Sequence, residues 1–199
     1  MISGRSGLLA LAVLAWCTGV ADAAEGGPAE LDLLMQRMAS VKSASAKFVE
    51  RRELRLLEKP VESSGTLLYT APDRLERHTL RPRTESMILS RDMLTLEDRA
   101  RNRTRSLPLQ QYPLIWAFAE SLRSVLAGDL ATLRRFYEVD YSGDAGNWTL
   151  LMRPRDAEMR RYVDDIRIHG SENVLRVVEV NQTGGDRSVM TVSGAAREQ

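Results

Sequence analysis

The feature that most limits the fold of this chain is a run of short strand-like segments between residues 45 and 107. Six such segments follow one another, and turn signals such as Ala71-Pro72-Asp73 and Arg81-Pro82-Arg83 separate them. Because the links are too short for the crossovers that parallel strands need, consecutive segments are predicted to pair as antiparallel hairpins. A meander of this kind has one apolar face and one solvated face.

Helical patterns stand before and after this meander. Apolar residues recur at helical spacing between Leu31 and Val41, which predicts an amphipathic helix. A second helix is predicted to begin at Pro113 and to end near Gly128, and its first half is apolar nearly all round, which indicates burial on two sides. Asp129 is suited to cap a further helical turn over residues 130–136.

Five more strand-like segments lie between residues 137 and 194, so the chain carries about eleven strands and two or three helices. Their order is helix, strands, helices, strands. One large antiparallel sheet, curved and covered on its concave face by the helices, accommodates all of them. The predicted fold class is therefore α+β.

The N-terminus has the pattern of a secretory signal peptide. Arg5 precedes an apolar run over residues 8–20, and Ala21-Asp22-Ala23 forms a small-x-small cleavage site. The run is shorter than the roughly 20 residues of a membrane-spanning helix, although a retained anchor is the alternative. We expect cleavage after Ala23 and a single domain over residues 24–199, which contains no cysteine because the only one is Cys17.

The sequence contains no recognisable catalytic constellation. His78 lies in a charged segment and is expected to be exposed, and His169 is expected at a hairpin end; neither has a partner at metal-ligand spacing. No serine lies in a G-x-S-x-G elbow, and no glycine loop is suited to hold phosphate. We therefore predict no catalytic residue, metal or cofactor, and no enzyme activity. A lipid hydrolase is the alternative, for which no nucleophile–base pair can be named.

The overall charge excludes few classes of function, because acidic residues balance the basic ones and the net charge is +1. The densest basic run extends from Arg99 to Arg105. In an exported chain that is nearly neutral, we interpret this run as a solvated strand rather than a nucleic-acid site. A contact with anionic lipid headgroups is the alternative.

The succession of local motifs carries a family resemblance. "ASVKSASAKFVE" combines small residues with Phe48, "GTLLYTAPDRL" is a glycine-led strand that enters a proline turn, and "LRPRTESMILS" repeats a proline before a strand. Helices after Pro113 and the strands "NWTLLMRP" and "RSVMTVSG" follow. Over roughly residues 31–193 this order resembles the bacterial outer-membrane lipoprotein carrier family, the LolA-like proteins.

The resemblance implies a half-barrel with an apolar cavity between the sheet and the helices. It also implies a monomeric periplasmic carrier in a Gram-negative bacterium, exported by the Sec route. Such a carrier binds acyl chains of a lipoprotein or another lipid, takes them from an inner-membrane exporter and passes them to an outer-membrane acceptor, without contact with nucleic acid. The alternative is a periplasmic sensor that binds a protein partner through the same fold.

Candidate cavity residues are the large apolar side chains of the strands and the second helix. Burying acyl chains contributes about 0.8 kcal/mol per CH₂ group, and methionines suit an adaptable wall. The candidates are Phe48, Leu68, Leu75, Met87, Leu89, Leu96, Trp116, Phe118, Leu122, Trp148 and Leu150.

Two positions and one segment depart from the family pattern. Ala71 stands where the family has an arginine before the proline, which is thought to latch the helical lid, and Arg77 stands where the family has a tryptophan. The family's segment beyond the last strand is missing after Ser193. A different cargo, such as a glycolipid or a lipid-linked product, is therefore an alternative to a lipoprotein.

Overall fold

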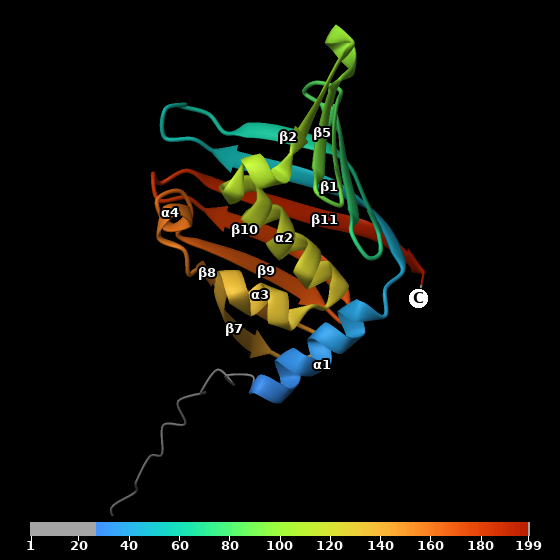
Figure 1. Ribbon diagram of the computed structural model, residues 1–199, viewed down its shortest axis with the longest axis vertical. Helices are drawn as coiled ribbons and strands as arrows, with labels where there is room; N and C mark the ends of the chain where they lie inside the picture. The colour runs from blue at the N-terminus through green and yellow to red at the C-terminus, as the bar shows by residue number, and fades with distance from the viewer. Residues whose placement is uncertain (1–26, 199) are drawn as a thin grey trace, which may run out of the picture.

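The computed structural model describes residues 27–198, so the predicted signal peptide lies outside the described residues. In this range one eleven-stranded antiparallel sheet curves around the helices (Figure 1). The sheet is open, with β6 and β7 at its two edges. The predicted α+β class, the curved antiparallel half-barrel and the helices on the concave face are confirmed.

The strands form two meanders that meet in the middle of the sheet. The order is β6-β5-β4-β3-β2-β1-β11-β10-β9-β8-β7, so the first and the last strand of the chain are neighbours. The strands are β1 (Ser43–Glu53), β2 (Val61–Thr70), β3 (Arg74–Arg81), β4 (Glu85–Ser90), β5 (Met93–Asp98), β6 (Arg103–Pro108), β7 (Tyr137–Gly143), β8 (Trp148–Pro154), β9 (Asp165–Ser171), β10 (Val174–Asn181) and β11 (Arg187–Glu198).

The helices begin and end where the local chemistry requires. Pro113 occupies the first turn of α2, and the side chain of Asp129 accepts a hydrogen bond from the Thr132 amide at 2.9 Å to cap α3. Asp156 caps a one-turn helix, α4, that the sequence pattern did not predict. The helices are α1 (Pro28–Ala39), α2 (Pro113–Ala127), α3 (Leu130–Phe136) and α4 (Ala157–Arg160), with short 3₁₀ turns η1 (Arg99–Arg101) and η2 (Leu109–Gln111).

Helices α2 and α3 connect the two edges of the sheet. After β6 the chain crosses the concave face through α2 and α3 and enters β7 at the opposite edge (Figure 1). The larger apolar core lies on the β7–β9 side, where buried residues such as Leu34, Trp148 and Ile168 pack together. A smaller cluster joins Leu89 and Leu109 to Trp116. The two clusters place the helices over the concave face.

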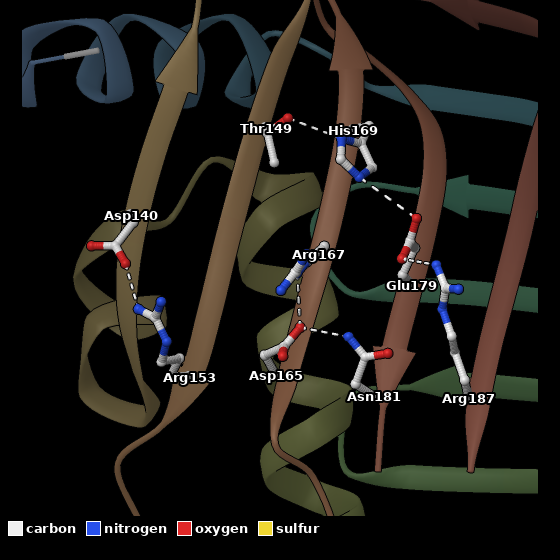
Figure 2. A network of polar contacts seen from close by, with 9 residues as sticks. All are labelled: Asp140, Thr149, Arg153, Asp165, Arg167, His169, Glu179, Asn181 and Arg187. Atoms are coloured by element: carbon white, nitrogen blue, oxygen red, sulfur yellow. Dashed lines mark hydrogen bonds and ion pairs between the residues drawn. The ribbon is translucent and has the colours of Figure 1, made fainter. Parts of the chain in front are cut away.

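The outer face of β7–β11 is polar. Figure 2 shows cross-strand pairs on it, with Asp140 to Arg153 at 2.6 Å, and Glu179 between His169 at 3.8 Å and Arg187 at 2.7 Å. Such exposed pairs contribute little to stability, about 0–1 kcal/mol each, but they keep this face solvated. Apolar binding must therefore use the concave face on this side of the sheet.

Several local expectations need correction. His169 lies within β9, where it pairs with Thr149 rather than ending a hairpin. His78 is only partly exposed, because its ring nitrogens contact Ser86 and Glu76 at 3.0 and 2.9 Å. Strand β11 continues beyond Ser193 to Glu198 and pairs there with the start of β1.

Gly128 fixes the contact between α1 and α2. It ends α2 with a φ of +68°, and a Cβ atom there would lie 2.1 Å from the carbonyl oxygen of Met35 in α1. Only glycine combines that left-handed conformation with so close an approach.

We expect Gly128→Ala to lower the free energy of unfolding by at least about 2 kcal/mol, because backbone strain and overpacking add. Urea denaturation followed by circular dichroism measures the effect. The control is Gly184→Ala, where a Cβ atom meets nothing within 4 Å and the change is expected to stay within about 0.5 kcal/mol. Equal losses in the two variants would contradict this account of Gly128.

Candidate binding cavity

A cavity of about 490 Å³ lies between the concave face of the sheet and the helices. This volume is within the range of roughly 300–1,000 Å³ that small-molecule sites occupy. Its wall is mainly apolar and comes from both meanders and from two helices. The apolar wall includes Met38, Val41, Ala44, Ala46, Leu67, Tyr69, Leu75, Met87, Leu89, Leu94, Leu122, Leu126, Met152, Ile166, Ile168, Leu175, Val178, Val180, Met190 and Val192.

Small side chains of β1 help to leave this space unfilled. Ala44 and Ala46 lie on the concave face because alternate residues of a strand share a face. Methionines from separate elements, Met38, Met87 and Met190, also border the cavity. Their unbranched side chains can adjust to a guest, which a wall of β-branched residues could not do as readily.

One ionic cluster interrupts the apolar wall. Glu50 in β1 accepts hydrogen bonds from Arg77 in β3 at 2.5 Å, from Ser188 in β11 at 2.5 Å and from Ser63 in β2 at 3.2 Å. The Arg77 guanidinium also lies 4.5 Å above the centre of the Phe48 ring. A single carboxylate therefore joins four neighbouring strands at the centre of the sheet.

The surroundings of Glu50 keep its carboxylate ionised. Only 7% of the residue is exposed, and burial by itself would raise its pKa. Hydrogen bonds from Ser188, Arg77 and Ser63, with the positive charge of Arg77, outweigh burial and hold the pKa below the ordinary value of 4.5. The wall thus carries a compensated ion pair, since a lone buried charge would be far more costly.

Tyr69 adds an unused donor to the wall. Its hydroxyl is buried, and it has no hydrogen-bond partner among the described residues. Burial, with a contribution from the Asp73 carboxylate, raises the pKa of Tyr69, so the hydroxyl remains protonated at neutral pH. An unpaired buried hydroxyl costs about 1–3 kcal/mol.

Helix α2 is attached to the sheet by its own arginine. Arg123 is 9% exposed, donates from Nη1 to the carbonyl oxygen of Arg91 at 2.7 Å, and also pairs with Glu120. The Leu109 amide donates to the Asp92 carbonyl oxygen at 2.8 Å, so the β4–β5 turn contacts both α2 and the η2 turn that precedes it. At the family's latch position, Ala71 makes only a backbone hydrogen bond, to Lys42.

The structure brings together some of the predicted cavity residues and separates others. Leu75, Met87, Leu89 and Leu122 line the cavity. Leu68 borders it, but strand register places Leu68 on the face opposite Leu67 and Tyr69, and 36% of it is exposed. A one-residue shift along a strand changes the face, so Leu67 supplies the wall that was assigned to Leu68.

The other candidates do not line the cavity. Phe48 is buried beneath Arg77, whereas Trp148 and Leu150 are fully buried in the larger core. Leu96 pairs with the lining residue Met87 but is 37% exposed and outside the lining, and Trp116 packs edge-on against Phe136. The Phe118 side chain lies outside what the structure describes.

Two sets of lining residues escaped the sequence analysis. The alternation of Ser188, Met190 and Val192 in β11 could have been found, because it follows the two-residue period of a strand. In β10 a register irregularity between Leu175 and Val177 turns Leu175 to the cavity and leaves Arg176 exposed. No local sequence signal predicted that bulge.

An open antiparallel sheet wrapped around helices and an apolar cavity defines a binding or carrier fold. The chain belongs to the family described as outer membrane lipoprotein carrier protein LolA-like, whose model matches residues 23–199. Members of this family are periplasmic or otherwise extracytoplasmic. Across residues 27–198, no helix has both the length and the apolar character needed to span a bilayer.

Solved structures resemble the chain in fold alone. A LolA superfamily protein from Nitrosomonas europaea has 10% identity and a TM-score of 0.47, over 85% of this chain and 94% of that one. A putative outer membrane lipoprotein-sorting protein domain from Vibrio parahaemolyticus has 10% identity and a TM-score of 0.46, over 86% and 93%. No curated protein matches the sequence significantly.

The Glu50 cluster predicts a pH dependence of stability. Because the folded pKa is depressed, its stabilisation is present above the unfolded pKa of about 4.5 and is lost as pH falls through the folded value. Glu50→Gln is therefore expected to be less stable than wild type by about 2 kcal/mol or more at neutral pH. The difference should shrink in acid.

Urea denaturation at a series of pH values measures this difference. Glu58→Gln is the control, because Glu58 lies exposed in the β1–β2 turn and its loss should change little. A Glu50→Gln deficit that stays constant down to strongly acidic pH would contradict the role given to the carboxylate.

The Arg123 contact predicts the mobility of α2. Arg123→Met keeps the aliphatic bulk and removes the hydrogen bonds, so amide hydrogen exchange in α2 should accelerate about tenfold or more. Mass spectrometry of exchange measures the effect, with Arg134→Met on the exposed face of α3 as the control. Unchanged exchange in α2 would show that other contacts hold the helix.

Proposed function

We propose that this protein is a periplasmic carrier that holds the acyl chains of a lipoprotein or another lipid in its cavity and moves them from the inner toward the outer membrane. The observation that supports the proposal is the apolar cavity of about 490 Å³ between sheet and helices. Burial of one acyl chain of about sixteen carbons contributes on the order of 10 kcal/mol before costs. This gain allows a lipid to cross water inside a protein shell.

The wall suits an amphiphile rather than a pure hydrocarbon. Leu75, Leu89 and Leu122 are proposed to contact the acyl chain, with Leu67, Val178 and Val180 from the neighbouring strands. The guanidinium of Arg77, which borders the cavity, offers donors to an ester, amide or phosphate oxygen. A cargo with chains and a polar linkage would use both kinds of surface.

The attachment of α2 combines polar and apolar contacts. Arg123 joins the helix to the β4–β5 turn by a hydrogen bond, and residues such as Val125 and Ala119 pack in the apolar clusters, so opening must break both kinds of contact. We propose that the chain acts as a monomer after removal of residues 1–23, receives cargo from an inner-membrane exporter and delivers it to an outer-membrane acceptor. Transfer of this kind involves no covalent step and no catalytic residue.

Cargo binding is tested by expressing the protein in the periplasm, purifying it without detergent and identifying extracted lipids by mass spectrometry. A fluorescent acyl probe should displace the copurified lipid. Ala46→Phe places a ring in the cavity and is expected to weaken probe binding about tenfold or more, because the ring occupies the space of the guest.

The matched control is Ala131→Phe, which adds the same ring at an exposed position of α3 and should leave probe binding unchanged. If no lipid copurifies with the protein and the protein also fails to bind the probe, the carrier function is refuted. That result would favour a sensor that binds a protein partner.

A further inference from the structure

Three hairpin turns lie at the same end of successive strands and are spread along one end of the curved sheet (Figure 1). The pairs Arg52–Val61, Ser64–Arg81 and Asp98–Arg103 place the β1–β2, β3–β4 and β5–β6 turns at the same end of successive strands. The last of these turns, η1, forms one extremity of the molecule (Figure 1). We call residues 51–62, 81–85 and 97–105 the arginine rim.

The arginine rim concentrates positive charge. It contains ten of the 28 Lys and Arg residues but only six of the 27 Asp and Glu residues, although the whole chain has a net charge of +1. All ten basic residues are exposed: Arg51, Arg52, Arg55, Lys59, Arg81, Arg83, Arg99, Arg101, Arg103 and Arg105. The excess is a local property of this end of the sheet and not of the composition.

Most of these cations are free of acidic partners. Within the described part of the chain, only Arg51 and Arg101 of the rim form ion pairs, with Glu53 at 3.4 Å and Asp98 at 3.5 Å. The outer face of β7–β11 differs, because Arg153, Arg167 and Arg187 each meet an acid there (Figure 2). The unpaired arginines of the rim are therefore available to an external anion.

The rim also presents apolar side chains at a fixed tip. Leu56 is 98% exposed and Leu57 is 50% exposed in the β1–β2 turn. Arg55 holds the base of that turn, since its Nη1 donates to the Gly184 carbonyl oxygen at 2.9 Å and its amide donates to Asp186 at 2.8 Å. The two leucines therefore project from an anchored turn and contact no core.

We propose that the arginine rim is a docking surface for anionic phospholipid bilayers. Cations that meet lipid phosphates, beside leucines that enter the interfacial layer, form the combination by which peripheral proteins bind such membranes. Arg52 belongs to the rim and also lines the cavity, so docking brings one end of the cavity to the bilayer. The proposal does not depend on what the cavity carries.

The test is cosedimentation of the purified protein with vesicles of equal parts phosphatidylglycerol and phosphatidylcholine, compared with phosphatidylcholine alone. Wild type should bind the anionic vesicles selectively, and high salt should weaken binding because it screens exposed charges. The combined variant R99Q/R101Q/R103Q/R105Q should bind roughly 100-fold more weakly. Leu56→Ala should weaken binding about tenfold through lost insertion.

The control variant R153Q/R155Q/R167Q/R176Q removes the same charge from four exposed arginines outside the rim, in or next to β8–β10, and should bind like wild type. Circular dichroism and acyl-probe binding should be unchanged in the rim variant, which separates docking from cargo binding and from unfolding. Equal weakening in the two arginine variants, or wild-type binding that does not require anionic lipid, would overturn the proposal. Failure of wild type to bind any vesicle would also overturn it and point to an acidic protein partner.

Discussion

The pairing of β1 with β11 is the contact on which the rest of the structure depends. It joins a meander from the first half of the chain to one from the second half, and without it there would be two small sheets, each unable to enclose a cavity. Glu50 lies on this seam and accepts hydrogen bonds from Ser188 on one side and from Ser63 and Arg77 on the other. A buried ion pair contributes little net stability, but it helps to fix the register of neighbouring strands. A strand shifted by one residue would leave the buried charges unpaired.

The residues at the β1–β11 pairing also explain why the cavity is both open and apolar. Around the Glu50 cluster, β1 contributes Ala44 and Ala46, and β11 contributes Met190 and Val192. Helix α2 covers this surface and is held through the β4–β5 turn by Arg123. The sheet is held together by its backbone hydrogen bonds, whereas its cover is held by the apolar packing of α2 and by the Arg123 contact.

Sequence reasoning recovered the elements because it depends on local periods, and all eleven strands and the two long helices follow such periods. It failed where the answer depends on pairing partners. Leu68 and Leu67 cannot be told apart without knowing which face of β2 is concave, and the bulge that exposes Arg176 depends on β9. Glu50 and Arg77 are 27 residues apart, and Arg123 and Arg91 are 32 apart, so neither contact has a local signal. Trp148 and Leu150 are apolar enough for either cavity or core, and only packing decides.

The crossover formed by α2 and α3 has a consequence for the size of any guest. This segment is both the cover of the cavity and the link between the two outermost strands, β6 and β7. It therefore limits how far the cavity can expand. A larger guest must either lift α2 and α3 away from the sheet or reduce the curvature of the sheet, and either movement strains the connecting segment. Capacity is limited by the length of a connecting segment, in addition to the side chains of the wall.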